Sequence, residues 1–460
     1  MEYDLIIRNA HVYAPQDLGQ MDVAVTAGKI AAIEPEIAGA AGREINGAGK
    51  ILLPGVIETH AHMSMPFAGT KTMNTFYDGT YAGAFGGVTA LVDFAQQYSG
   101  VSLEMSLRDR LEEARGRCVV DYGFHITLTR TDDATIAEIP RLCEAGYTSF
   151  KVHTTYKGGG LYIDTPGLKR CFAAIGDCGG IVTVHAENDD MIENARKRLL
   201  SQGKESASYF PLYKPDEAEE EAVIRCIRIA KETRCKLLIR HISSAAAAAS
   251  IFAAQEEGYP IYAETCPQYL AFTREVYARD NGRDYILHPP IRGEKDRDAI
   301  WEAIQKGIKI TIATDDCGFY LSQKHMDDTF YGVPGGLPGL ETRLLAMYSL
   351  GIDTGRISLS RLAEMTAELP AKLYGLYPQK GTLKVGSDGD MVLLDPARKT
   401  TITAAKLHER ADYTPFEGMC ATASLDKTIA RGKVIVDGET FLGKEGEGQL
   451  LKRELPMDIN

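Results

Sequence analysis

The sequence predicts an α/β fold in which a TIM-like (β/α)8 barrel carries a small β-sandwich domain built from both termini. At 460 residues the chain is longer than one hydrophobic core usually supports. Short β-prone runs alternate with helical segments between Pro54 and about Lys380, and both ends of the chain are rich in short strands. We therefore expect residues 1–53 and 381–460 to form the β-sandwich domain and its tail, and residues 54–380 to form the barrel.

The two ends of the chain share a pattern of short strands and tight turns. From Asp4 to Leu53 apolar and polar residues alternate, and Ala27-Gly28-Lys29 is a turn between two such runs. Residues 428–438 form a second clear hairpin. Sheets this small expose an apolar face that needs a cover. The simplest arrangement is one sheet domain built from both ends, with the middle of the chain inserted between them.

The middle of the chain contains eight β-prone runs separated by helical stretches, such as 107–115, 218–233, 251–257 and 297–306. Eight strand-helix units predict a barrel whose chemistry lies at the carboxyl ends of its strands. The expected strands are 56–62, 89–94, 119–128, 149–153, 181–185, 236–242, 260–265 and 310–315.

Composition excludes several classes of protein. Hydrophobic residues make up 44% and charged residues 25%, as in ordinary globular proteins. A net charge of −12 disfavours nucleic acid and anionic membranes as partners, and no apolar run reaches membrane-spanning length. The nine cysteines form no CxxC pair, and their odd number argues against a complete disulfide framework. With no signal peptide visible at the start, we expect a cytoplasmic protein.

The ends of the expected strands collect side chains that bind metals. His60 and His62 project to the same side of the first strand, because alternate residues of a strand do. Imidazole is a common metal ligand, although one His-x-His pair is a weak signal and is often just a pair of core or surface histidines. The ends of the other expected strands strengthen the prediction of a metal site, because they also carry residues that can bind metals. The full candidate set is His60, His62, Lys151, His185, His241 and Asp315.

This set holds more ligands than one tetrahedral ion needs, which predicts two divalent metal ions. Two neighbouring cations need a bridging anion, yet no acidic residue ends the fourth strand. Lys151 can supply the anion if its amine reacts with carbon dioxide to give a carbamate, because desolvation among cations lowers the pKa of a lysine. The alternative interpretation, which would be preferred for an isolated lysine, is a side chain that extends its ammonium group to solvent. Imidazole and carboxylate ligands fit zinc, and manganese and iron are admissible.

These residues lie in motifs that resemble those of the cyclic amidohydrolases, and most closely the dihydropyrimidinases and hydantoinases. The similarity runs nearly end to end. It is carried by His60-Ala61-His62, Ser149-Phe150-Lys151, Val184-His185-Ala186-Glu187-Asn188, Arg240-His241-Ile242-Ser243, Glu264-Thr265-Cys266-Pro267-Gln268-Tyr269-Leu270, Thr314-Asp315, the segment 371–381 and Phe416-Glu417-Gly418-Met419.

The resemblance implies a division of the ligands between two metals. One ion would be held by His60, His62, the carboxylated Lys151 (an N6-carboxylysine) and Asp315, and the other by Lys151, His185 and His241. It also implies the split sheet domain and a homotetramer.

The activity implied by the resemblance is hydrolysis of a ring amide in a small cyclic ureide or imide, a hydantoin or dihydropyrimidine, to an N-carbamoyl amino acid or half-amide. Asp315 would carry a proton from the attacking hydroxide to the departing ring nitrogen. Tyr156 would donate its hydroxyl to the oxyanion, although outside this context a loop tyrosine that packs on its neighbours is the default. The backbone at His288 and at Gly335 would bind the polar edge of the ring.

Four positions depart from the pattern of the family and put its familiar substrates in doubt. His288 stands where a small serine is usual. Asp316 stands where histidine often follows the catalytic aspartate, and its charge is expected to raise the pKa of Asp315. Glu58 replaces an aspartate ahead of the paired histidines. His153 replaces an apolar or aromatic residue and is expected to face the substrate or support the ligands.

Two segments resemble the loops that shape the pocket for the exocyclic substituent of the substrate. They are residues 63–72 and 156–162, and the glycines at 158–160 would make the second one mobile. The sequence leaves open the ring size, the preferred substituent and the choice between D and L substrates.

Other functions fit less well. A dihydroorotase usually has an arginine just after the paired histidines, where this chain has Met63-Ser64. An allantoinase-like activity remains open, whereas a mononuclear deaminase would lack Lys151. A cysteine amidase using Cys317 would need a histidine beside it. A non-catalytic tetrameric homologue would typically have lost some of the ligands, and all six are present.

Overall fold

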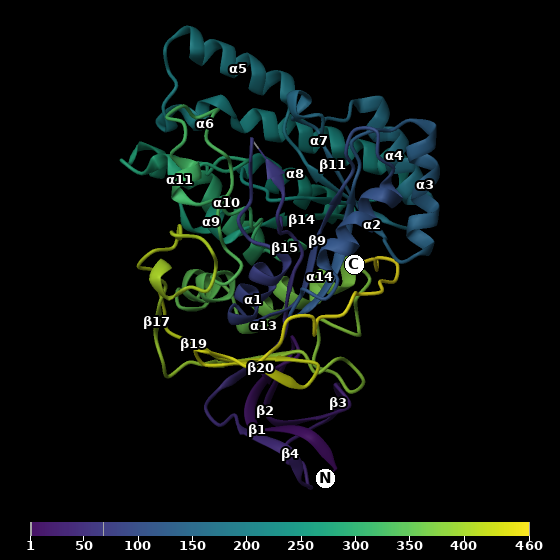
Figure 1. The fold of residues 1–460 in the computed structure, drawn as a ribbon, viewed down its shortest axis with the longest axis vertical. Coiled ribbons are helices and arrows are strands. Elements are labelled where there is room, and N and C mark those ends of the chain that lie inside the picture. Colours follow the sequence, from purple (N-terminus) through teal and green to yellow (C-terminus); the bar gives the residue numbers. More distant parts are fainter. Residues whose placement is uncertain (1, 68, 460) are drawn as a thin grey trace.

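The central feature is a sheet of eight parallel strands, as the sequence predicts (Figure 1). The computed structural model describes residues 2–67 and 69–459. Along the sheet the strands follow chain order, as expected when every strand is followed by a crossover. They are β6 (Val56–Glu58), β9 (Val88–Gln96), β10 (Asp121–Thr127), β11 (Ser149–His153), β12 (Ile181–His185), β13 (Lys236–Ile239), β14 (Ile261–Thr265) and β15 (Ile310–Ile312).

The first and last strands of this sheet meet just beyond their ends, which closes the barrel. Ala61 and Asp316 form a parallel bridge. The backbone N–H of Asp316 donates to the carbonyl of His60 (3.2 Å), and the N–H of His62 donates to the carbonyl of Asp316 (2.8 Å). The bridge thus joins the two chain segments that carry His60, His62 and Asp315.

Three strands end three or four residues earlier than the sequence suggested. β6 ends at Glu58, β13 at Ile239 and β15 at Ile312, so that the candidate ligands lie in the segments that follow. His241 and Asp315 adopt positive φ angles of 37° and 51°, which no regular strand contains. The regular pairing therefore stops before these residues, and irregular backbone positions their side chains.

Helices cover the outside of the barrel (Figure 1). One begins earlier than predicted because a capping side chain precedes it: Ser102 accepts from the N–H of Met105 and starts its helix at Leu103 rather than at residue 107. The main ones are α1 (Phe76–Phe85), α2 (Leu103–Ala114), α3 (Asp133–Glu144), α4 (Thr165–Asp177), α5 (Asp189–Ser201), α7 (Asp216–Thr233), α8 (Ala245–Glu256) and α10 (Glu294–Gln305).

Both ends of the chain build a second sheet of nine strands, as expected. β5 pairs antiparallel with β16, with Met391 opposite Pro54 and Leu394 opposite Ile51. In Figure 1 this sheet lies below the barrel, where purple strands from the start of the chain meet yellow strands from near its end. Its strands are β1 (Tyr3–Tyr13), β2 (Asp17–Thr26), β3 (Lys29–Glu34), β4 (Ala41–Asn46), β5 (Ile51–Pro54), β16 (Met391–Asp395), β19 (Ser424–Ala430), β20 (Lys433–Asp437) and β21 (Thr440–Phe441).

A buried lysine connects this terminal sheet to the barrel. The ammonium of Lys380 lies 2.7 Å from the carboxylate of Asp121 in β10, and 3.0 and 2.6 Å from those of Asp388 and Asp390, which precede β16. Because the three carboxylates surround one ammonium, this acidic cluster is a structural ion-pair network.

One disulfide, Cys143–Cys178, joins the ends of α3 and α4, and the cysteine spacing did not predict it. The remaining seven cysteines are free, and all of them except Cys420 are buried. No helix in residues 2–67 and 69–459 combines the length and apolar character that crossing a bilayer requires.

Candidate metal centre and active site

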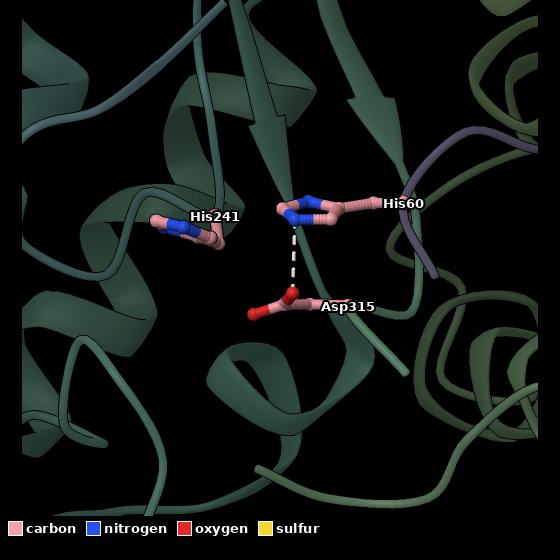
Figure 2. Close-up of side chains that lie close together, drawn as sticks. All are labelled: His60, His241 and Asp315. Carbon is pink, nitrogen blue, oxygen red and sulfur yellow. Dashed lines mark ion pairs between the residues drawn. The ribbon is translucent and has the colours of Figure 1, made fainter. Parts of the chain in front are cut away.

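Three of the predicted ligands converge on one point at the barrel mouth. Possible ligand atoms of His60, His241 and Asp315 all lie within 4.8 Å of one another (Figure 2). The Oδ1 atom of Asp315 is 2.9 Å from Nε2 of His60 and 3.4 Å from Nε2 of His62. Residues that follow three different strands thus meet around a shared centre.

Lys151 lies beside this centre and is almost fully buried. Its Nζ atom is 3.1 Å from Nε2 of His60 and 4.3 Å from the centroid of the Phe94 ring. Burial lowers the pKa of Lys151 to about 8, although the charge of Asp315 opposes the shift. A larger fraction of its amine is therefore unprotonated near neutral pH than in an ordinary lysine.

His185 and His241 form the other side of the centre, with ring centroids 4.5 Å apart. Burial lowers the pKa of each imidazole below its ordinary value. Neutral imidazoles are the form that binds metal ions. The structure therefore brings together all six residues that the strand ends predicted.

Two buried carboxylates orient the histidines from behind. Glu264 in β14 accepts from Nδ1 of His60 (2.6 Å), and Glu187 accepts from Nε2 of His185 (2.6 Å). Each contact occupies one nitrogen of the ring. The second nitrogen, which is Nε2 in His60 and Nδ1 in His185, stays available to a metal ion. The quoted motifs contain both acids, but their roles were missed; the available signal for Glu264 was a charged residue inside an apolar strand.

Each of these carboxylates has its own cationic partner. Arg240 donates to Glu264 (2.7 Å), and the ammonium of Lys214 lies 2.5 Å from Glu187. Burial alone would raise the pKa of Glu187, but Lys214 and His185 hold it well below its ordinary value. Glu187 is therefore ionised and able to hold the His185 ring.

The residues fit a divalent metal centre. The Nδ1 atoms of His62 and His241 are buried and have no hydrogen-bond partner among the described residues. Buried nitrogen atoms without a partner are costly unless something else satisfies the ring. A set of neutral imidazoles, one carboxylate and carboxylate-supported rings is the donor chemistry of zinc and related ions.

Three of the candidate site residues have a strained backbone. Tyr156, His241 and Asp315 all have φ in the left-handed region, at 69°, 37° and 51°. Residues other than glycine adopt this region at a cost, and such residues cluster at functional sites. Their strained backbone sets the direction of three of the side chains discussed here.

A cavity of about 350 Å³ opens onto this centre, and Tyr156, His288 and Gly335 all line it. The Tyr156 ring lies 5.1 Å from that of His185 and 6.0 Å from that of His288. Burial raises the pKa of Tyr156 well above its ordinary value, so its hydroxyl stays a donor. His288 lies so close to Gly335 that a Cβ there would approach its ring to 2.4 Å, so a larger residue at position 335 would displace the ring.

The departures from the family pattern have distinct places in the structure. His288 and His153 both line the cavity. Glu58 is buried, with its carboxylate 3.2 Å from Arg343, and supports the segment below His60. The loop 63–72 contributes Met65, Pro66 and Phe67 to the cavity, while Ala68 within it is outside the described residues.

The pKa of Asp315 is lowered, not raised as expected from the presence of Asp316. The carboxylate of Asp316 accepts from the N–H of Gly339 (2.9 Å) and from Asn74 (3.3 Å). Burial alone would raise the pKa of Asp315, but His60 and His62 hold it well below its ordinary value. It is the pKa of Asp316 that burial raises.

Cys317 also lines the cavity, but its chemistry disfavours a nucleophilic role. Burial raises the pKa of its thiol well above the ordinary value, so the reactive thiolate is scarce.

Comparisons with known proteins match the whole chain. The profile of the amidohydrolase family matches residues 51–435. A D-hydantoinase of Ralstonia pickettii is 36% identical over 455 residues, which cover 98% of this chain and 99% of that protein. A D-hydantoinase of Geobacillus stearothermophilus is 35% identical over 453 residues, covering 97% and 96%.

A solved structure agrees with these relatives. The dihydropyrimidinase of Brevibacillus agri superposes with a TM-score of 0.95 at 36% sequence identity, over 98% of both chains. The match thus extends over the barrel, the terminal sheet and the segments that carry the clustered histidines. The chain therefore belongs to the amidohydrolase family.

Proposed function

We propose that the protein hydrolyses a ring amide of a cyclic ureide or imide, a hydantoin or a dihydropyrimidine, to an N-carbamoyl amino acid or half-amide. The observation that carries this proposal is the convergence of His60, His241 and Asp315 beside the buried Lys151, at the mouth of a cavity. Full-length relatives named as D-hydantoinases support the substrate class.

The residues that would hold two divalent ions follow from the cluster. His60, His62, Lys151 and Asp315 would hold one ion, and Lys151, His185 and His241 the other; zinc fits, and manganese or iron is admissible. Lys151 would serve both ions as a carbamate, formed when its neutral amine bonds to the carbon of carbon dioxide and releases a proton. When bound, such ions lower the pKa of water and polarise a carbonyl group.

The side chains around the cavity would then perform the proton transfers and hold the substrate. Asp315 would accept a proton from the attacking hydroxide at its carboxylate and deliver it to the departing ring nitrogen. The hydroxyl of Tyr156 would donate to the carbonyl oxygen as that atom gains charge. Backbone groups of His288 and Gly335 would bind the imide edge of the ring and so orient the scissile bond.

The test is a substrate panel with purified, metal-loaded protein supplied with bicarbonate. We expect ring opening of hydantoin or dihydrouracil, and two metal ions per chain by elemental analysis. Succinimide, 5-substituted hydantoins and allantoin extend the panel and separate an allantoinase-like activity from the proposed one. At most one bound ion would contradict the two-metal arrangement, and an inactive protein that holds both ions would favour a non-catalytic homologue.

Lys214 provides a test of the support behind His185. In Lys214→Met the buried carboxylate of Glu187 loses its ammonium partner, and the His185 ring loses its fixed orientation. We expect metal affinity, measured by competition with a chelator, to fall by about 10- to 100-fold, the usual cost of losing such outer support. Lys214→Arg retains the charge and should retain much of the affinity.

The exposed Lys197 in α5 offers a matched control, because Lys197→Met removes a lysine that is not buried. If folded Lys214→Met bound metal as tightly as this control, Lys214 would have no part in positioning His185.

We further infer a homotetramer, which the resemblance to the dihydropyrimidinases and hydantoinases implies. We also infer a cytoplasmic protein, from its cysteine usage, that acts on small molecules; its acidic composition disfavours nucleic acid and membranes as partners. Sedimentation of the purified protein tests the oligomeric state.

A further inference from the structure

One wall of the cavity consists of polar side chains that the proposed reaction does not use. Gln96, Thr127 and His153 all line the cavity, and they come from the carboxyl ends of the neighbouring strands β9, β10 and β11. Thr127 is paired with Gln96 on one side and with Lys151 on the other. Because alternate residues of a strand face the same side, His153 faces the barrel mouth with Lys151.

His153 is the unsatisfied member of this wall. Its side chain is buried, with 6% of the residue exposed, and its Nδ1 atom has no hydrogen-bond partner among the described residues. The ring lies 5.9 Å from that of Tyr156 and 5.8 Å from that of His185, so it borders the reacting centre. A buried nitrogen that lacks a partner in the protein but faces a cavity is a candidate for pairing with a ligand.

The chemistry of the ring places the substituent of the substrate at this wall, and this step rests on the proposed function. In a hydantoin the scissile carbonyl is bonded on one side to the nitrogen that leaves and on the other to the carbon that bears the exocyclic group. The nitrogen side belongs to the imide edge, which we assign to the backbone of His288 and Gly335. His288 and Gly335 lie in the loops that follow β14 and β15, whereas His153 ends β11, and all three line the same cavity. With the imide edge held by these loops, the exocyclic group on the other side of the ring would meet the wall that contains His153.

We propose that His153, with Gln96 and Thr127, forms a subsite for an uncharged exocyclic group that both donates and accepts hydrogen bonds, of the carboxamide class. An amide, a hydroxyl and an imidazole offer both donors and acceptors but no full charge. The cavity also has apolar residues, among them Phe67 and Leu161, which would favour an aryl substituent. An aryl group against the wall would leave the His153 nitrogen unpaired in the complex. The energetic cost of that unpaired nitrogen favours a carboxamide substituent over an aryl one.

The experiment compares hydantoins that carry a carboxamidomethyl or a benzyl group on this carbon. In the wild type, kcat/KM is expected to be higher for the carboxamide. His153→Phe should lower kcat/KM for the carboxamide by about 10- to 100-fold, mainly through KM, which corresponds to one lost hydrogen bond in a buried site. Activity on the benzyl compound should hold or rise, and His153→Gln should recover part of the loss.

Binding of both compounds, measured by calorimetry, separates this inference from the proposed function. A protein that opens hydantoin but prefers the benzyl compound, or a His153→Phe variant that weakens both compounds equally, overturns the subsite alone. A protein that opens no ring, yet binds the carboxamide more tightly than the benzyl compound in a His153-dependent way, keeps the subsite and overturns the proposed function. A protein that shows neither ring opening nor selective binding of the carboxamide overturns both proposals.

Discussion

Lys151→Ala is expected to reduce ring opening to background. Lys151 is buried beside His60, with its Nζ atom 3.1 Å from Nε2 of that ring, and alanine removes the amine from which the proposed bridging carbamate would form. Loss of the bridge should also lower the metal content. The measurements are kcat/KM on hydantoin or dihydrouracil and elemental analysis of the same protein.

Chemical rescue gives this variant its control. A short-chain carboxylic acid added to Lys151→Ala fits the space of the missing side chain and supplies two oxygen atoms in place of the carbamate, so activity should partly return. An alkylamine of similar size, which restores the amine but lacks the acid group, serves as the matched additive. Full activity of Lys151→Ala without any additive would remove Lys151 from the mechanism.

Tyr156→Phe is expected to lower kcat by about two to three orders of magnitude, the usual effect of losing one oxyanion donor. The hydroxyl stays protonated because burial raises the pKa of Tyr156, and the ring lies against His185 at the centre. The donated hydrogen bond strengthens as charge develops on the carbonyl oxygen, so KM and metal content should change little.

A nearby tyrosine supplies the comparison for this variant. Tyr213 at the end of α6 (Phe210–Tyr213) shares a neighbouring cavity with Tyr156, and burial raises its pKa to about 12. It does not line the cavity at the metal centre. Tyr213→Phe should therefore leave kcat within a few-fold of the wild type. If Tyr156→Phe behaved in the same way, Tyr156 would be a packing residue.

The barrel and the convergence of the candidate ligands could be predicted because they depend on periodicity and topology. The carboxyl ends of parallel strands meet at one mouth, so residues as distant as His60 and Asp315 could be placed together before any contact was known. The positions where β13 and β15 end could not be predicted in the same way. They depend on positive φ angles at His241 and Asp315, and nothing in either residue type demands that conformation.

The supporting carboxylates show a second limit. Glu187 lies two residues from His185, but its ammonium partner Lys214 is 27 residues further along the chain, in a segment that has no motif of its own. The unpaired nitrogen of His153 is likewise a property of what surrounds it in space. Such pairings depend on side-chain directions across several elements, which a single sequence does not encode in any local pattern.

The buried Lys380 limits how freely the terminal sheet could be exchanged between relatives. The ammonium of Lys380 is shared by Asp121 of the barrel and by Asp388 and Asp390 of the chain that enters the terminal sheet. Breaking such a buried pair on one side costs about 3–5 kcal/mol. A chimaera that exchanged the terminal sheet for that of a relative would therefore have to match the carboxylates on both sides of this seam. The barrel and the terminal sheet therefore depend on each other for stability, although they are separate sheets.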